Sequence, residues 1–145
     1  GTDTAFGYDS ADRQTSMVDS TGTTSWTYDV ADRLTQLATP QGTISYAYDN
    51  DDRRTSMTDS SGTTSYSYDV ADRLLSLVNP FSETTGWTYD DENKVTRQTF
   101  STGAYTDYGY DDADRSTRMT TGGLTTTYAY DKSPDITNNK PQYDQ

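Results

Sequence analysis

Aromatic and small polar residues alternate in short stretches of this chain, and each stretch ends in a tyrosine that is followed by an aspartate. In Thr23–Tyr28, Trp26 and Tyr28 are two positions apart, with Thr27 between them and Ser25 before them. Side chains of a β-strand point alternately to its two faces. The period therefore predicts a strand with its aromatic residues on one face and small polar residues on the other.

A second type of strand, such as Arg33–Leu37, precedes a turn that contains glycine, such as Thr39–Gly42. Glycine provides the positive φ that tight turns require, so each pair of strands is expected to form a β-hairpin. An apolar column runs through this strand type at Met17, Leu37, Met57, Leu77 and Met119, with Gln98 as the exception. Two positions earlier lie Thr15, Thr35, Thr55, Thr96 and Thr117, with Leu75 as the exception.

The hairpin pattern has a fixed period, marked by the motif Tyr-Asp-x-x-Asp-Arg, whose tyrosines recur every 20 or 21 residues. A period of this size predicts a repeat architecture. The expected fold class is all-β, with stacked antiparallel hairpins in one continuous sheet. The motif residues are Tyr8, Asp9, Arg13, Tyr28, Asp29, Asp32, Arg33, Tyr48, Asp49, Asp52, Arg53, Tyr68, Asp69, Asp72, Arg73, Tyr89, Asp90, Tyr110, Asp111, Asp114, Arg115, Tyr130 and Asp131.

The predicted domain organisation is a hairpin array of about six repeats over residues 1–131, followed by an irregular C-terminal tail over residues 132–145. Ser133-Pro134 and Lys140-Pro141 cannot continue a central strand, because proline lacks the N–H that the ladder needs. The chain begins at Gly1 rather than at a methionine, and we expect a processed chain or a piece of a longer one.

The charged residues of the motif are expected to form a network along one edge of the sheet. Asp29, Asp32 and Arg33, together with their copies, would pair within a repeat and between neighbouring repeats. Exposed ion pairs contribute only about 0–1 kcal/mol each. Their expected role is therefore to fix the loop and the register, since a slip of one residue would turn every aromatic side chain to the wrong face.

The composition alone is close to that of a disordered chain, with 30% hydrophobic residues, a net charge of -12 and a mean hydropathy of -1.00. The aromatic content of 12% argues for folding, because tyrosine, tryptophan and threonine favour strands. We expect the aromatic columns to form the core of the stacked hairpins. The acid excess disfavours nucleic acid as a partner, and no apolar run is long enough for membrane insertion.

No catalytic, cofactor-binding or metal-binding residue is predicted. The chain has no cysteine and no histidine, which excludes disulfides and thiolate or imidazole metal sites. Most aspartates occupy repeated positions, as an architectural role predicts, and no singular group suggests an enzyme. The oxygen-rich stretches Asp49–Asp52 and Asp111–Asp114 are an alternative as Ca²⁺ sites, but arginine-balanced, solvated loops are favoured because the 12-residue calcium loop is absent.

From Tyr8 to about Asp131 the chain resembles the YD-repeat family, also called the Rhs repeat. The resemblance lies in Tyr-Asp-x-x-Asp-Arg-Leu at 28–34 and 68–74, and in the run Gly-Thr-Thr-x-Tyr-x-Tyr-Asp at 62–69. It implies a spiralling β-sheet that builds a hollow shell or barrel, as in Rhs toxins, C subunits of insecticidal toxin complexes, wall-associated proteins and teneurins. In the toxins the shell encloses a toxic segment. No catalytic residue follows from the resemblance.

The sequence thus predicts a non-enzymatic structural repeat protein, exported or at the cell surface of a bacterium, that forms a shell, a tube or a filament. Open sheet edges make the protein itself the expected partner, through end-to-end assembly. One alternative is carbohydrate binding, with Trp26 and Trp87 as residues that would stack on sugar rings. Another alternative is a fragment of a toxin-encapsulating Rhs shell.

Overall fold

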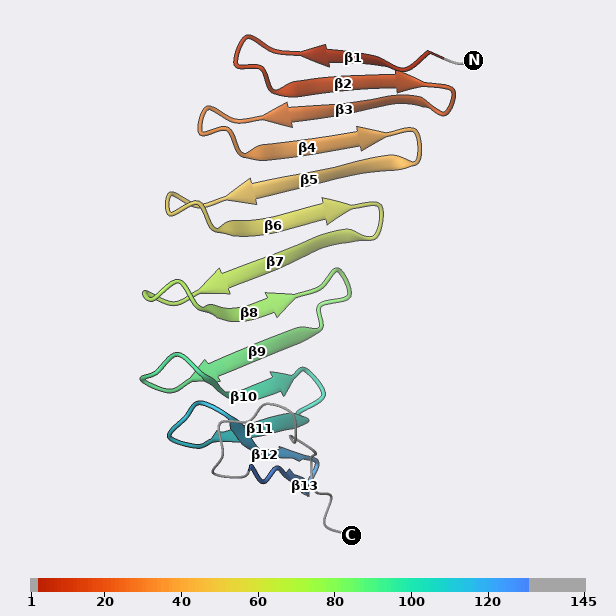
Figure 1. The fold of residues 1–145 in the computed structure, drawn as a ribbon. Helices are drawn as coiled ribbons and strands as arrows, with labels where there is room; N and C mark the ends of the chain where they lie inside the picture. Colours follow the sequence, from red (N-terminus) through yellow and green to blue (C-terminus); the bar gives the residue numbers. More distant parts are fainter. Residues whose placement is uncertain (1–2, 131–145) are drawn as a thin grey trace. The chain divides into compact units, whose positions relative to one another are not determined.

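The structure is a computed structural model that describes residues 3–130, and every regular element in this range is a β-strand (Figure 1). The strands follow one another in the sheet in chain order and pair antiparallel, which confirms the predicted fold class. They are β1 Ala5–Tyr8, β2 Gln14–Asp19, β3 Gly22–Tyr28, β4 Leu34–Thr39, β5 Gly42–Tyr48, β6 Arg54–Asp59, β7 Gly62–Tyr68, β8 Leu74–Val78, β9 Thr84–Tyr89, β10 Val95–Phe100, β11 Tyr105–Tyr110, β12 Ser116–Thr121 and β13 Leu124–Thr127.

The chain divides into two compact units. The first contains the described residues up to Ser67 together with Val78–Ser82, and the second contains Tyr68–Leu77 and the residues from Glu83 on. In the first unit, Figure 1 shows strands joined alternately by a loop at one side and a tight tip at the other. The predicted tail over residues 132–145, and the motif residue Asp131, lie outside the described residues.

The register in the first unit places the aromatic and apolar side chains on one face. Trp26 of β3 lies opposite Leu37 of β4, and Leu37 lies opposite Ile44 of β5. Ser25, the neighbour of Trp26, lies opposite Ser16 and belongs to the other face. The predicted division into an aromatic face and a small polar face is therefore present in the sheet.

The threonine column is a row of β-bulges, and in this respect the structure differs from the regular strand that the sequence predicted. Thr27 pairs with Gln36 and Tyr28 pairs with Leu34, which leaves Thr35 without a partner residue across the ladder. The register shifts in the same way around Thr15, Thr55, Thr96 and Thr117. A bulge adds one residue to one strand and increases its local twist.

None of the hydrophobic side chains in the described part of the chain is buried, so the expected aromatic core is wrong. Trp26, Leu37 and Tyr48 are all half-buried. The physical reason is that one sheet covers its side chains only from the flanks, because the described elements include no second layer to pack on the face. Thr106 is the one buried residue in this range, with 7% of its surface exposed.

The two repeats of 21 residues place their extra length in the tips. A tip and a bulge were the two positions that could hold it. The connection between β8 and β9 runs over residues 79–83, where the N–H of Ser82 donates to the carbonyl of Asn79 at 3.0 Å. The connection between β10 and β11 contains Gly103 at a φ of 83°. The ladder between β10 and β11 continues in register from Arg97 to Thr99.

Candidate functional site

The repeated motif folds into a corner loop that its first aspartate holds closed. The Asp29 carboxylate accepts hydrogen bonds from the N–H groups of Ala31 at 2.9 Å and Arg33 at 3.0 Å. The N–H of Asp29 donates to the carbonyl of Arg33 at 3.0 Å, and the N–H of Asp32 donates to the carbonyl of Asp29 at 3.2 Å. Because both backbone groups of Arg33 bond within the loop, β4 begins at Leu34 and not at Arg33 as predicted.

The second aspartate of the motif has a left-handed backbone, which the sequence analysis missed. Asp32 has a φ of 62°, in the region that costs most side chains energy but that aspartate and asparagine tolerate. The same conformation occurs at Asp12, Asp52, Asp72, Asn93 and Asp114, with φ between 61° and 67°. The alternation of aspartate with asparagine at this one motif position was the signal that would have indicated it.

The arginine of each corner links its own loop to the next one. Nε of Arg33 donates to the Asp29 carboxylate at 2.8 Å. Nη1 of Arg33 donates to the carbonyl of Asp49 at 2.9 Å and to the carboxylate of Asp52 at 2.7 Å, both in the next repeat. The predicted edge network of aspartates and arginines is thus present, and it bridges neighbouring hairpins.

The tyrosine of the next repeat completes the link. The Arg33 guanidinium lies 4.8 Å from the centre of the Tyr48 ring, within the range of a cation–π contact. The Tyr48 hydroxyl donates to the carbonyl of Leu34 at 2.8 Å. We call this set of contacts the corner clasp. The clasp joins the arginine of one corner, and the carbonyl of the residue after it, to the tyrosine and the two aspartates of the next corner.

The corner clasp recurs in both units, with small changes of chemistry. Arg73 donates to Asn93 at 3.0 Å, and Lys94 donates to Asp114 at 2.7 Å. The Lys94 side chain makes no hydrogen bond to Asp90 of its own loop, and only its backbone N–H and carbonyl bond to that residue. The stacked pairs and their distances are Arg13 over Tyr28 at 4.8 Å, Arg73 over Tyr89 at 4.7 Å, Lys94 over Tyr110 at 5.5 Å and Arg115 over Tyr130 at 4.6 Å.

These contacts shift the proton affinity of the charged groups. Hydrogen bonds from the backbone and the side chain of Arg33 hold the pKa of the Asp29 carboxyl below its ordinary value of 3.8, against the opposing effect of desolvation. The Arg13 side chain likewise lowers the pKa of Asp9. The carboxylates of Asp114 and Glu92 raise the pKa of Lys94 above its usual range. Each charge is therefore stabilised by its place in a corner.

Acid is expected to unfold the array because its corner carboxylates must be protonated. The pKa values of Asp9 and Asp29, the first aspartates of their corners, are lower in the folded chain than in the unfolded one, so the stability they provide is present above the unfolded value of 3.8 and is lost below it. The melting temperature, followed by circular dichroism, should fall as the pH drops below about 4. Asp29→Asn should weaken this dependence. A melting temperature that stays constant down to about pH 2 would contradict the assignment.

The two tryptophans proposed for ligand stacking lie in the ladder. Trp26 is opposite Leu37 on β4, and Trp87 of β9 is opposite Gln98 on β10. Both indole rings are half-buried. Neither residue lines the surface hollow described next. The structure thus gives both tryptophans neighbours across the strands.

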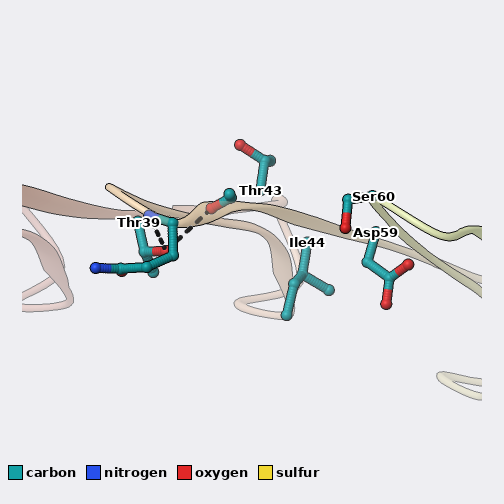
Figure 2. A pocket seen from close by; sticks show the side chains of 7 residues that line it. Thr39, Thr43, Ile44, Asp59 and Ser60 are labelled. Atoms are coloured by element: carbon teal, nitrogen blue, oxygen red, sulfur yellow. Dashed lines mark hydrogen bonds between the residues drawn. The ribbon is translucent and has the colours of Figure 1, made fainter.

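A surface hollow of about 260 Å³ lies between two neighbouring tips of the first unit (Figure 2). Thr39 and Ile44 line it from one hairpin, and Asp59 and Ser60 line it from the next. The hollow has a simple origin. A Cβ on Gly22 would lie 2.7 Å from Pro40 of the following tip, and Gly62 is covered by Pro80 in the same way.

Gly42 has a φ of 154°, and a Cβ added to it would have no atom within 4 Å, because the residue at the corresponding place of the next tip is Ser60 and not a proline. The hollow therefore marks the one of these three tips that no proline covers. Its rim is polar and contains the hydroxyl of Thr39, which accepts from the N–H of Gln41 at 3.2 Å and donates to the carbonyl of Gly42 at 3.1 Å.

Ser60→Pro is expected to fill the hollow and to stabilise the protein by about 0.5–1 kcal/mol. Proline suits the position after Asp59, because Pro40 occupies the same place in a tip of the same length. Ser61→Pro is the matched control and should destabilise, since the N–H of Ser61 donates to Asp59 at 2.7 Å. Chemical denaturation measures both effects, and equal changes for the two variants would contradict this explanation.

The described residues contain neither a group of three or more acidic side chains arranged to hold a metal ion nor a helix that is long and apolar enough to cross a membrane. The oxygen-rich stretch Asp49–Asp52 is part of a corner loop. Asp49 in it pairs with Arg53 at 2.8 Å, and Asp52 pairs with Arg33. Asp111 pairs with Arg115 at 2.8 Å.

Fold and clasp together define a class of protein, the array of stacked β-hairpins with a repeated linking motif. The family model described as RHS Repeat matches residues 8–44, 28–64 and 48–84, which together cover more than half of the chain. The chain therefore belongs to the RHS repeat family, and the resemblance seen in the sequence is confirmed. No curated protein matches the chain.

Solved structures with a similar fold include complexes of TcdB2 with TccC3 and a Tc holotoxin pore. The TcdB2-TccC3-Cdc42 complex matches 94% of this chain and 9% of its own with a TM-score of 0.70 and 17% identity. The TcdB2-TccC3 complex matches 94% of this chain and 10% of its own, with a TM-score of 0.69 and 18% identity. A Tc holotoxin pore of Photorhabdus luminescens matches 86% of this chain and 9% of its own, with a TM-score of 0.54 and 14% identity. The chain thus spans about a tenth of these chains, and the likeness concerns the fold.

Proposed function

We propose that this chain is a non-enzymatic wall segment, a set of hairpin repeats that extends a β-sheet in the shell, tube or filament of an exported or cell-surface bacterial protein. The corner clasp carries the proposal. In the clasp, each polar group of the motif has a partner within its own corner or in the next one. Arg33, for example, bonds to Asp29 in its own corner and contacts Asp49, Asp52 and Tyr48 in the next. A motif whose polar atoms are used to join hairpins favours architecture over catalysis.

The acids outside the motif support the non-enzymatic part of the proposal. Asp107 is held by Arg97 through two hydrogen bonds, at 2.5 Å and 2.9 Å. Hydrogen bonds from arginine lower the pKa values of Asp29 in the motif and of Asp107 outside it, whereas a general acid needs a raised pKa. These observations favour carboxylates that serve as fixed structural charges.

The similar structures support a wall of a larger particle. One of them is a Tc holotoxin pore, and this chain matches about a tenth of each of the similar chains. In this proposal the repeats form one stretch of a longer wall, as in a toxin-encapsulating shell, or they join end to end into a filament of identical chains. Both arrangements use the same lateral contacts between hairpins.

Negative-stain electron microscopy with size-exclusion chromatography on the purified chain tests the proposal. Long, uniform filaments would support a polymer subunit, and small discrete particles with cooperative unfolding would support a wall segment of a longer chain. Circular dichroism provides the control for folding. A chain that has no β signal, or that forms only amorphous aggregates, would contradict an autonomous structural array.

Carbohydrate binding is a second candidate, and the polar hollow between the tips favours it. Hydroxyl, amide and carboxylate groups of Thr39, Gln41 and Asp59 line this hollow beside the apolar Ile44. Such a mixture suits the polar and apolar faces of a sugar ring. Isothermal titration with a panel of soluble glycans tests this candidate, with Ser60→Pro as the variant that should abolish binding. Tryptophan fluorescence on the same titrations tests Trp26 and Trp87.

A further inference from the structure

The small polar face of the sheet changes in character at three neighbouring strands of the second unit, β10, β11 and β12 (Figure 1). Arg97 in β10 and Arg118 in β12 take a position at which the earlier outgoing strands have Ser16, Gln36, Ser56 and Ser76. In β11, Tyr105 and Asp107 take the positions at which β3, β5 and β7 have threonine and serine. Because those other strands pair with small residues at these positions, the fold itself does not require the larger ones.

The larger side chains form a cluster around Asp107. Arg97 lies opposite Asp107 in the ladder and donates two hydrogen bonds to its carboxylate, at 2.5 Å and 2.9 Å. The guanidinium of the same arginine lies 4.2 Å from the centre of the Tyr105 ring. Asp107 therefore holds Arg97 against a tyrosine that has 41% of its surface exposed.

Arg118 approaches the cluster from the other side of β11. It lies opposite Gly109, and a Cβ on this glycine would be 3.5 Å from Nε of Arg118, so the arginine side chain folds over β11. The hydrogen bond from Arg97 lowers the pKa of Asp107, and the nearby charge of Arg118 lowers it further. Among the described residues, none forms a hydrogen bond or an ion pair with the exposed Arg118 side chain.

The cluster has one more positive charge than it has carboxylates. The arginine of a corner, in contrast, pairs with at least one carboxylate, as Arg33 does with Asp29 and Asp52. The described chain thus uses its corner cations to join hairpins and leaves the charge of Arg118 without such a use. In a chain with a net charge of -12, this is a local positive patch on the face of the sheet. Its complement in charge is a carboxylate.

We propose that Tyr105, Arg97 and Arg118 form a docking site for an acidic segment of a partner protein, which we call the β11 site. A glutamate or aspartate side chain of the partner pairs with the planar fork of Arg118. The rest of the segment lies over the Tyr105 ring and the small residues around it. Asp107 is a positioning residue that holds Arg97 against the ring. This inference goes beyond the proposed wall role and does not depend on it.

The composition of the β11 site favours a protein segment over other acidic partners. Tyrosine and arginine are enriched among the residues that contribute most to protein–protein binding. Arg97 already lies over the Tyr105 ring, where a sugar ring would stack. A nucleic acid would be repelled by the net charge of -12. Both flanks of β11 are paired, so the partner binds through side chains and not as an added strand.

Fluorescence polarisation with a fluorescein-labelled peptide of alternating glutamate and glycine measures binding to the purified chain. The control peptide has glutamine in place of each glutamate. Salt at about 0.15 M limits the repulsion by distant charges to a range of about 8 Å, so that pairing at contact decides the result. We expect the glutamate peptide to bind about fivefold more tightly than the glutamine peptide, which is the upper value for an exposed ion pair.

Arg118→Gln should remove this preference for glutamate. The variant is expected to fold, because the side chain is exposed and is not bonded within the described range. Arg118→Lys keeps the charge but loses the planar fork, so it should keep part of the preference. Arg54→Gln is the matched control, since it removes the same charge from β6, where Arg54 lies 4.6 Å from the Tyr66 ring. It should leave the preference unchanged, and circular dichroism checks the folding of each variant.

Equal affinity for the two peptides, or a preference that survives in Arg118→Gln, would overturn the inference. So would an equal loss of preference in Arg54→Gln. A uronic-acid oligosaccharide is the second probe. If it bound through Arg118 while the glutamate peptide did not, the site would recognise a glycan and the proposed protein partner would be wrong. Filaments or discrete particles without any peptide preference would remove the β11 site alone and leave the wall role standing.

Discussion

Tyr48→Ala is expected to destabilise the first unit by about 2–3 kcal/mol, below the range for a fully buried aromatic residue because the ring is half-buried. The ring lies under Arg33 at 4.8 Å, and its hydroxyl donates to Leu34 at 2.8 Å. Truncation therefore removes apolar contact, a cation–π contact and a hydrogen bond between two hairpins. Urea denaturation followed by circular dichroism measures the loss.

Tyr48→Phe separates the ring from the hydroxyl and should cost about 1 kcal/mol, the usual value of one hydrogen bond. Ser65→Ala is the control on the opposite, polar face of β7, and its effect should stay within about 0.5 kcal/mol. If Tyr48→Ala lowered the free energy of unfolding no more than Ser65→Ala, the tyrosine would not hold neighbouring hairpins together, and the clasp would not contribute to stability.

Asp32→Val is expected to destabilise by about 2 kcal/mol through its backbone. Asp32 has a φ of 62°, a conformation in which a β-branched side chain is strained. The substitution also removes the carboxylate that accepts from Arg13 at 2.5 Å. Thermal and urea denaturation measure the combined effect, which should exceed that of valine at an exposed loop position with ordinary backbone.

Asp32→Asn separates the two causes. Asparagine tolerates the left-handed backbone and can accept from the arginine, as Asn93 does from Arg73 at 3.0 Å. This variant should lose much less stability than Asp32→Val, and Asp32→Gly should fall between them. Equal losses for valine and asparagine would mean that the charge, and not the backbone, sets the requirement for aspartate at this position.

The sequence by itself determined the fold class and the repeat length. The alternation of aromatic and small polar residues around Trp26 and Tyr28 predicts strands, because successive side chains of a β-strand point to opposite faces. Turn glycines such as Gly22 and Gly62, found at φ of 128° and 125°, mark the tips for an equally local reason. The pairing of Asp29 with Arg33 was also accessible, since the two residues are four positions apart within one loop.

The sequence predicted that aspartates and arginines pair between neighbouring repeats, but only the tertiary structure decided which of their atoms meet and that the tyrosine joins them. Arg33 reaches Asp52, 19 residues away, and stacks on Tyr48, while a bulge at Thr35 interrupts the ladder beside the same corner. The bulge and the left-handed backbone of Asp32 are local irregularities that lie beside the contacts between repeats. The alternation of residues within one repeat does not predict either irregularity. The half-burial of the aromatic face was likewise decided by the single layer, since hydrophobic pattern gives the direction of a side chain but not what covers it.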